Sequence, residues 1–283
     1  MKKLLLLGVV ALSFLTTLSA QIKTPAPSPG CKITQDIGLI KVDVDYSRPS
    51  AKGRKIFGEL VPFGEVWRTG ANSATKVTLS DDATIGGSKV PKGTYALYTI
   101  PTEKEWTVMF YKNTTIGGGL TLKDVKDEEV AAKFTVESMK SRESVESFLI
   151  YFDNLRNNSG EMVLAWDKTK VVIPIVLDTD TKVMADIKKV MAGPDANAYY
   201  AAGRYYYEEK KDLKQALEWI NKSLELGGDK FWILRLKSQV QADLGMKKDA
   251  IATAQKSADL AKAEGNMDYV RMNEKSIEEW SKK

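Results

Sequence analysis

The hydrophobic pattern of this chain changes once, near Leu177, and that change limits the folds open to it more than any other feature. Before Leu177, short apolar or alternating runs are separated by Gly, Pro, Asn and Asp, which is typical of antiparallel β structure. After it, helix-forming residues continue to Lys283, with Gly, Asp and Asn where helix ends need them. The 283-residue chain is therefore expected to form two domains.

The first part predicts a β-sandwich over residues 36–177. Its clearest strand is Leu39 to Tyr46, because Ile40, Val42, Val44 and Tyr46 would share one face. Further strands are expected at residues 75–79, 94–100, 106–111, 132–136, 145–152, 162–166 and 170–177, with turns at 101–104, 157–160 and 167–169. Roughly eight or nine short strands without a long helix favour a sandwich, and a closed barrel fits the same pattern.

The second part, residues 178–283, predicts an all-α domain of about five helices with an internal repeat. The segment 212–226 matches the segment 246–260, so that Ala216 aligns with Ala250 and Ser223 with Ser257, 34 residues later. This is the period of tetratricopeptide repeats, in which a small residue lets paired helices approach closely. Because two repeats are fewer than a repeat core normally needs, Met267 to Trp280 is expected to cap one end.

The N-terminus predicts export. Residues 1–20 combine Lys2 and Lys3 with a short apolar run and a small residue, Ala20, near which a signal peptide would be cleaved. Residues 21–35 are interpreted as a proline-rich linker. The protein is therefore expected in the periplasm or secreted, with no transmembrane segment in the mature chain.

Composition excludes several kinds of chemistry. The chain has no histidine, which rules out Ser-His-Asp and Cys-His catalysis and every histidine-containing metal site. Its single cysteine, Cys31, cannot form an internal disulfide. We expect no metal and no cofactor. The formal charge of +5 gives no support for binding to nucleic acid.

One stretch resembles a known family. Its motifs are Arg48-Pro49-Ser50, Lys52-Gly53-Arg54, Val61-Pro62-Phe63-Gly64, Val66-Trp67-Arg68-Thr69-Gly70-Ala71-Asn72 and Pro91-Lys92-Gly93-Thr94-Tyr95. They closely resemble the family called domain of unknown function 2911, secreted proteins of Bacteroidetes-type bacteria whose domain is often followed by a tetratricopeptide-like tail. The resemblance implies export and this domain order, and it implies no activity.

The same stretch suggests an anion or acidic-glycan site, since arginine suits carboxylate, phosphate and sulfate groups. The residues that would form it are Arg48, Lys52, Arg54, Arg68 and Asn72. In the alternative interpretation, these side chains bond carbonyl and carboxylate groups and hold loops together, while Phe63 and Trp67 fill the core.

A second candidate surface lies in the helical part. Aromatic residues recur there at helical spacing, at Tyr199, Tyr200, Tyr206, Trp219 and Trp232. Most would be core, and those that project from the helices would suit a groove for a partner protein.

These observations favour an exported envelope or periplasmic interaction protein without enzymatic activity. Its β domain would bind a ligand or surface, and its helical repeats would dock a partner. The alternative is a carboxylate-based enzyme acting on envelope glycan or polysaccharide, for which the β domain offers Asp43, Asp45, Asp81, Asp82 and Asp153.

Overall fold

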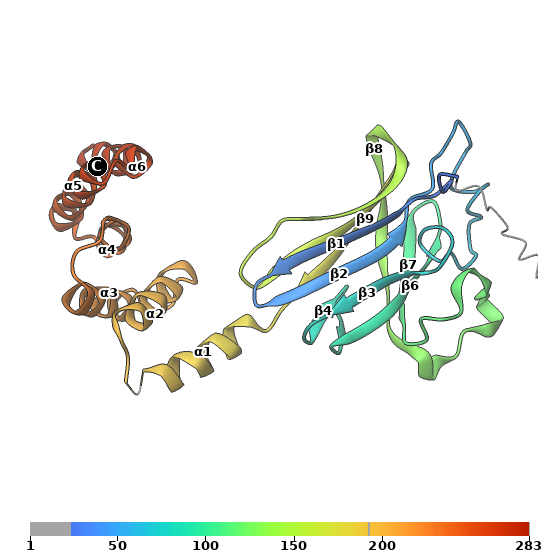
Figure 1. Cartoon of the computed structure of the whole chain (residues 1–283), viewed down its shortest axis with the longest axis horizontal. Helices are drawn as coiled ribbons and strands as arrows, with labels where there is room; N and C mark the ends of the chain where they lie inside the picture. Colours follow the sequence, from blue (N-terminus) through green and yellow to red (C-terminus); the bar gives the residue numbers. More distant parts are fainter. Residues whose placement is uncertain (1–23, 192, 283) are drawn as a thin grey trace, which may run out of the picture. The chain divides into compact units, whose positions relative to one another are not determined.

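The computed structural model describes residues 24–191 and 193–282, which form two units that divide between Leu177 and Asp178 (Figure 1). The first unit is an antiparallel β structure and the second consists of helices. The predicted fold class, a mainly β domain followed by an all-α domain, is confirmed. The predicted signal peptide, residues 1–20, lies outside the described residues.

Nine strands form one sheet in the β unit. They are β1 (Gly30–Ile37), β2 (Ile40–Ser47), β3 (Thr75–Leu79), β4 (Ala83–Ile85), β5 (Ser88–Val90), β6 (Gly93–Pro101), β7 (Glu105–Tyr111), β8 (Val130–Asp153) and β9 (Ser159–Val176). Their order is β1-β2-β3-β6-β7-β8-β9-β4-β5, and neighbouring strands are antiparallel. The sheet is open, since β1 and β5 end this order.

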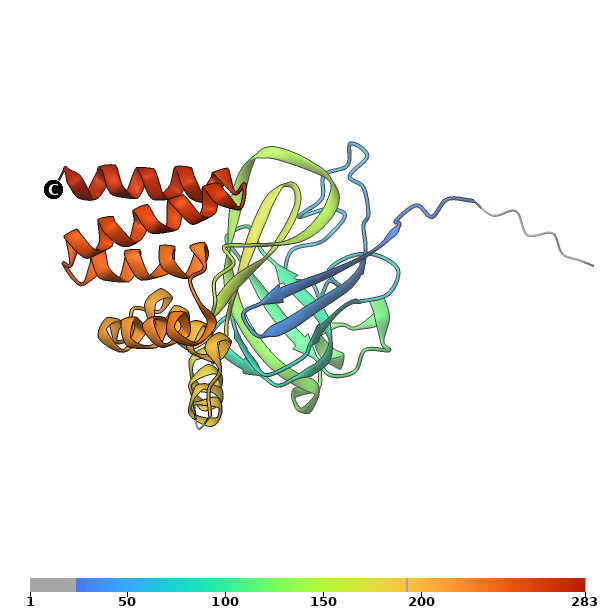
Figure 2. The ribbon, with the colours of Figure 1, turned by 60° about the vertical axis from the view of Figure 1, so that its left-hand side comes forward.

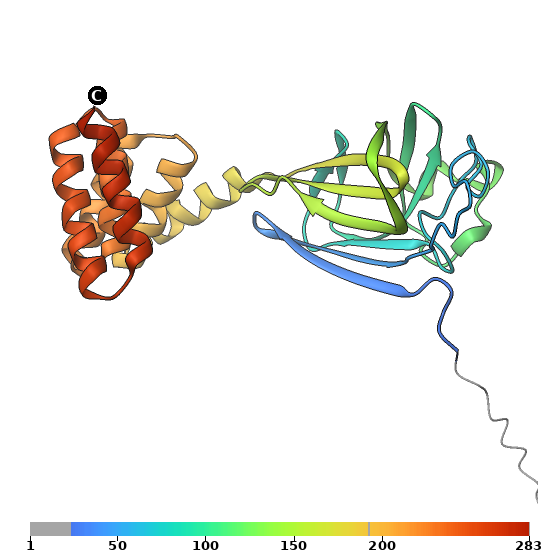
Figure 3. The ribbon, with the colours of Figure 1, turned by 90° about the horizontal axis from the view of Figure 1, so that it is seen from above.

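The sheet folds into two layers because β8 belongs to both halves. Its first part pairs with β7 as far as Glu137, and from Ser138 onward it pairs with β9. Figure 3 shows β1 and β2 in one layer and the yellow-green β8 and β9 in the other. Across the layers, the Ile150 N–H of β8 donates to the Tyr46 hydroxyl of β2 at 3.0 Å, and Phe148 contacts the Tyr46 ring edge-on.

The core lies between the layers and follows the alternation of the strands. The side chains predicted to share the inner face of β2, Ile40, Val42, Val44 and Tyr46, are all buried. Strands β6 and β7 are also covered on their outer face, where Tyr98 and other residues form a second, smaller cluster. The chain between β7 and β8, with short 3₁₀ turns at Gly117–Gly119, Leu122–Asp124 and Asp127–Glu129, contributes Leu120 to this cluster.

Several strand predictions are corrected by the structure. Residues 30–35, assigned to the linker, belong to β1, and the β4–β5 hairpin was missed. Residues 132–136 and 145–152 are parts of the single strand β8, as 162–166 and 170–177 are of β9, which ends at Val176. The turn predicted at 167–169 is wrong, because Asp167, with φ of 48°, instead marks an irregularity of register opposite Val145. Turns are present near 101–104 and 157–160, but Pro101 is the last residue of β6, and Ser159 and Gly160 already belong to β9.

The second unit contains six helices among its described residues, where about five were expected. They are α1 (Thr179–Val190), α2 (Ala196–Glu208), α3 (Leu213–Gly227), α4 (Phe231–Asp243), α5 (Lys247–Ala263) and α6 (Met267–Ser281). From α2 to α6 each helix packs against the next (Figure 2). None of the helices in residues 24–191 and 193–282 has both the length and the apolar character that crossing a bilayer requires.

The internal repeat of the sequence is visible as a repeated helix pair. Ser223 in α3 donates its hydroxyl to the carbonyl of Ala196 at the start of α2, at 2.7 Å. Ser257 in α5, 34 residues later, donates to the carbonyl of Phe231 at the start of α4, at 2.6 Å. Both serines are fully buried, as are Ala216 and Ala250. The pair α2–α3 is therefore repeated in its contacts by the pair α4–α5.

Candidate functional site

The residues predicted to form an anion site mostly hold loops together. The Arg48 Nε donates to the Phe148 carbonyl at 2.9 Å, and Arg54 donates to the carbonyls of Ala51 and Ser50 at 3.0 and 2.7 Å. These contacts favour the structural interpretation of the two arginines. Among the aromatic residues of the same motifs, Trp67 is buried as expected.

Two further members of the predicted site occupy tight turns. Lys52 and Asn72 both have left-handed backbone conformations, with φ of 49° and 59°. The Lys52 amide donates to the Glu146 carboxylate at 2.9 Å, and the Asn72 side chain donates to Ser28 and Ser47 at 3.1 Å each. These polar groups are thereby engaged within the protein.

Arg68 lies apart from those contacts. Its side chain is half-buried, and its Nε has no acceptor among the described residues. A Cβ atom at Gly118 would fall 2.8 Å from Arg68 Nη1, so the guanidinium lies directly against that glycine. Tyr98 is nearby, with its hydroxyl donating to the Gly117 carbonyl at 2.8 Å, and burial raises the pKa of this phenol while the charge of Arg68 opposes the rise. None of these contacts joins Arg68 to Arg48, Lys52, Arg54 or Asn72.

A hollow of about 440 Å³ lies where β8 leaves β7 and joins β9. Four segments build it: the loop before β3, the β6–β7 turn with the start of β7, the middle of β8, and Thr169 of β9. It is lined by Lys55, Phe57, Phe63, Thr102, Glu103, Lys104, Trp106, Ser138, Met139, Lys140 and Thr169. Loop and turn are fastened together here, since the Gly64 amide donates to the Pro101 carbonyl at 2.9 Å.

Aromatic side chains form one wall of this hollow. Phe57 packs on Trp106 with ring centroids 4.8 Å apart, and Trp106 in turn lies 5.9 Å from Trp67 in the core. Phe63, expected in the core, is 38% exposed. Its ring lies over Gly58, where a Cβ atom would be 2.8 Å from it. The hollow therefore offers apolar surface to a ligand.

The Trp106 indole is only 2% exposed, and its N–H has no acceptor among the described residues. The other two tryptophans of this cluster differ, since Trp67 donates to Gly70 and Trp166 to Glu146, each at 3.1 Å. A buried donor without an acceptor costs about 1–3 kcal/mol of stability. A ligand whose acceptor reached the Trp106 N–H would recover that cost.

The charge of the hollow is positive, with three lysines against one glutamate. Lys55 forms an ion pair with Glu59 at 3.3 Å. Lys104 and Lys140 have no carboxylate partner within the described parts of the chain. The combination of free ammonium groups with an aromatic wall suits an anion that also carries an apolar group.

The aromatic residues predicted for partner binding lie mostly in helix contacts. Tyr206 and Trp219 join α2 to α3 with ring centroids 4.6 Å apart. Tyr199 and Tyr200 are half-buried, and burial raises the pKa of Tyr200. Trp232 is 36% exposed and therefore reaches solvent.

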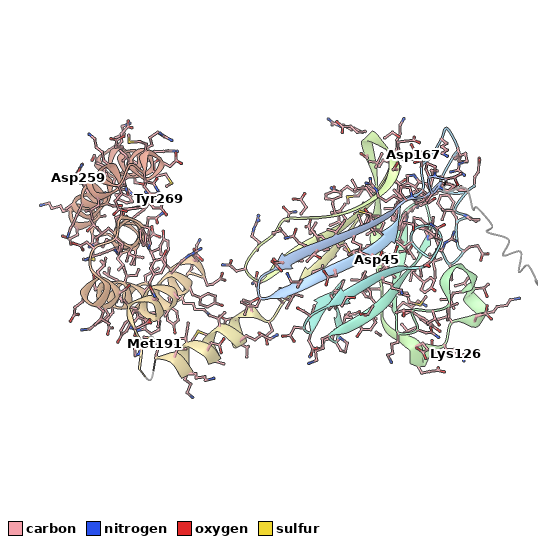
Figure 4. The ribbon with its side chains drawn as sticks, in the orientation of Figure 1. Asp45, Lys126, Asp167, Met191, Asp259 and Tyr269 are labelled. Carbon is pink, nitrogen blue, oxygen red and sulfur yellow. The ribbon has the colours of Figure 1, made fainter. Side chains whose placement is uncertain are left out.

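Arg235 of α4 is a residue that the sequence analysis missed. Its Nη1 donates to the side chains of Asn273 and Ser276 of α6, at 3.1 and 3.5 Å, and both partners are neutral. Burial lowers the pKa of Arg235, while the nearby Tyr207 and Tyr269 oppose this shift. Tyr269 is labelled on α6 in Figure 4. Arg235 is thus a partly buried cation that no carboxylate among the described residues neutralises.

The acids proposed for catalysis serve as turn and strand residues. The Asp82 carboxylate accepts from the Lys92 amide, and the Asp81 and Asp153 carboxylates each accept from the amide of the next residue, all at 2.8 Å. Asp43 and Asp45 lie on the outer face of β2 in a shallow hollow of about 280 Å³. No group of three or more acidic or cysteine side chains in the described residues is placed to hold a metal ion.

The β unit is thus an antiparallel sandwich with a hollow that has an aromatic wall and lysines around it. Residues 28–175, more than half of the chain, match the family described as "Protein of unknown function (DUF2911)", and the chain belongs to that family. Comparisons with curated proteins and with solved structures gave no match.

The hollow was missed at the sequence level although one of its residues adjoins a predicted one. Lys55 follows Arg54 directly, but Lys104 lies in a hairpin turn and Lys140 in a strand. Only the folding of β8 between the two layers brings them to one place. The useful signal would have been Lys104 beside Trp106, a cation and a large aromatic residue at the start of a strand.

Proposed function

We propose that this chain is an exported binding protein whose β unit takes an anionic ligand with an apolar ring or chain. The observation that carries the proposal is the hollow in which Lys104 and Lys140, without carboxylate partners among the described residues, adjoin Phe57, Phe63 and Trp106. An ammonium group bonds an anion with charge assistance, and an aromatic wall favours burial of an apolar group. The signal peptide read from residues 1–20 supports export.

The probe for this proposal is 1-naphthaleneacetate, with neutral 1-naphthaleneacetamide as its matched analogue. We expect titration calorimetry to show binding of the acid and at least about tenfold weaker binding of the amide, because charged hydrogen bonds contribute about 1.5–3 kcal/mol each. Replacing Lys104 and Lys140 together by Gln should weaken binding of the acid to a similar extent.

The control removes two charges elsewhere, as Lys89→Gln with Lys92→Gln, since both side chains are exposed and neither lines the hollow. This variant should bind the acid as the wild type does. Equal affinity for the acid and the amide, or equal losses in the two double variants, would count against the proposed site. The anion site predicted at Arg48, Lys52, Arg54, Arg68 and Asn72 stays a prediction.

For the helical unit we propose a tetratricopeptide-like domain that docks a partner polypeptide with an acidic segment. The repeated contacts of Ser223 and Ser257 support the repeat, and the partly buried, uncompensated Arg235 supports an acidic partner. A carboxylate entering beside Arg235 would supply the charge that Asn273 and Ser276 do not.

The test for this docking site is a fluorescein-labelled decaglutamate peptide and its decaglutamine counterpart, titrated into the protein at two salt concentrations. We expect only decaglutamate to bind, and Arg235→Gln to weaken it at least about fivefold. Lys237→Gln, a matched loss of charge on the same helix, should have less than half that effect on the binding free energy. Two results together would contradict the docking site: loss of all decaglutamate binding at the higher salt concentration, and equal weakening by Arg235→Gln and Lys237→Gln. They would show nonspecific charge attraction.

No observation in the described residues favours the alternative of a carboxylate-based glycan enzyme over binding. It remains a hypothesis, and turnover of an envelope glycan that is lost in Asp43→Asn or Asp45→Asn would establish it.

A further inference from the structure

Strand β1 presents a long free edge. It ends the strand order, and within the part of the chain that the structure describes only β2 pairs with it (Figure 1). Its eight residues contain no proline, and its pairing with β2 runs from Gly30 to Ile37 without a bulge. Proline and bulges are two of the devices by which proteins block an exposed edge, and β1 has neither. The opposite edge, β5, has only three residues and offers a much shorter template.

The turn fixes which backbone groups of β1 are free. Ile37 and Ile40 flank the two-residue turn and therefore exchange hydrogen bonds, and alternate pairs along the ladder do the same. The bond from the Arg48 amide to the Pro29 carbonyl, at 2.9 Å, continues this series. The odd-numbered residues of β1 thus bond to β2, and Lys32, Thr34 and Asp36 direct their amide and carbonyl groups outward.

A second copy of β1 can satisfy these groups in one favourable register. Antiparallel pairing about a two-fold axis at Thr34 places Thr34 opposite its own copy, and it places Lys32 opposite Asp36 in both directions. Centring the axis on Lys32 or on Asp36 would instead oppose like charges, which destabilises a sheet. The registers between these centres leave Lys32 opposite an uncharged residue. The strand is therefore complementary to itself in charge only about Thr34.

The outer face extends this complementarity across further strands. Within one copy, Lys41 pairs with Asp36 at 2.7 Å, and Lys32 pairs with Asp45 at 3.3 Å. Asp45 is labelled on β2 in Figure 4. Joining two copies would give a row in which Lys41 and Asp36 of one copy continue into Lys32 and Asp45 of the other, with charges that alternate at every step. Between the two such rows, Thr34 would meet Thr34.

We propose that two copies of this chain pair antiparallel through β1, about a two-fold axis at Thr34, and form a homodimer with one continuous sheet. This interface is independent of the hollow near Lys104 and of the ligand proposed for it.

The first test compares Thr34→Pro with Thr34→Ala in residues 21–283. Proline removes an outward N–H and places its ring on the free edge while leaving the hydrogen bonds to β2 in place, whereas alanine keeps the N–H. Sedimentation velocity should show a dimer for the wild type and Thr34→Ala. Thr34→Pro should raise the dimer dissociation constant at least about tenfold, since it removes two intermolecular hydrogen bonds. Circular dichroism checks that the β content is unchanged.

The second test exchanges charges. Lys32→Asp alone and Asp36→Lys alone should each weaken the dimer, because like charges then face each other across the axis. The double variant restores the 32–36 contact and should recover part of the loss, although its new charges adjoin like charges at Lys41 and Asp45. A wild type that stays monomeric at high micromolar concentration would overturn the proposal. So would a dimer that Thr34→Pro leaves unchanged, which would show that another surface is used.

Discussion

Replacing Gly86 by Ala should lower the free energy of unfolding by about 2–5 kcal/mol. The left-handed backbone contributes about 1–2 kcal/mol of this loss, and overpacking contributes about 1–3 kcal/mol. Gly86 and Gly87 form the turn between β4 and β5, with φ of 56° and 82°. A Cβ atom at Gly86 would lie 2.1 Å from the ring of Phe134. That ring has little freedom to move, since it stacks on the fully buried Phe110 at 6.3 Å.

The matched control for this change is Gly87→Ala. Its backbone is also left-handed, but a Cβ atom there would meet nothing within 4 Å. Only the backbone penalty should remain, about 1–2 kcal/mol. Urea unfolding of both variants, followed by tryptophan fluorescence, separates the steric cost from the conformational one. Equal losses would show that Phe134 gives way and that the turn fits the sheet loosely.

The hairpin at Gly86 also shows why the sequence predicted some strands and missed others. Strand β2 was recognised because one of its faces is buried and the other faces solvent, so that apolar and polar residues alternate along it. Strands β4 and β5 have three residues each, too few to establish a period. Strand β1 was assigned to the linker because its position at the sheet edge leaves its residues largely polar and half-exposed.

The long strands β8 and β9 were divided for a related reason. The middle part of β8 changes from one layer to the other, and residues 138–147 are polar or exposed for most of their length. Such a segment carries no apolar alternation, although its backbone bonds hold it in the sheet. Asp167, which resembled a turn residue, is instead accommodated within β9 opposite Val145, where the register shifts.

The candidate site depends on this same crossing of β8, which explains why local patterns did not reveal it. Motif matching drew attention to Arg48 and Arg54, yet arginine bonds backbone carbonyls as readily as it bonds ligands, and here it does the former. Lys104 and Lys140 belong to no motif. Their distinguishing property is their position beside the aromatic wall of the hollow, which only the three-dimensional arrangement can show.

Tyr46, which joins the two layers, should make the stability of the β unit depend on pH at high pH. Its ring is 2% exposed, and its hydroxyl lies between the amide and the carbonyl of Ile150, at 3.0 and 3.4 Å. Burial raises the pKa of this phenol to about 12 from its ordinary value of 10. Cys31 contributes to this rise, and the charge of Arg48 opposes it.

The sign of the effect follows from the linkage of protonation to folding. Because the folded state holds the phenol proton more tightly than the unfolded state, the contribution of Tyr46 is complete below pH 10 and falls as the pH rises from 10 to 12. A difference of about two pKa units corresponds to roughly 2–3 kcal/mol. The wild type should therefore lose this amount over that interval, in addition to the losses from other groups.

The variant Tyr46→Phe should be less stable than the wild type near neutral pH and should lose that disadvantage as the pH rises. Near neutral pH the variant leaves the buried Ile150 N–H without its acceptor and should be less stable by about 1–3 kcal/mol. Having no phenol to ionise, it should lack this part of the alkaline loss, so the difference should shrink or vanish by pH 12. Urea unfolding at pH 8, 10 and 11.5 measures the difference, and Cys31→Ser tests whether the thiol rather than the phenol sets the response. A difference that stays constant with pH would mean that Tyr46 ionises as freely in the folded protein as in the unfolded chain, which would contradict the prediction.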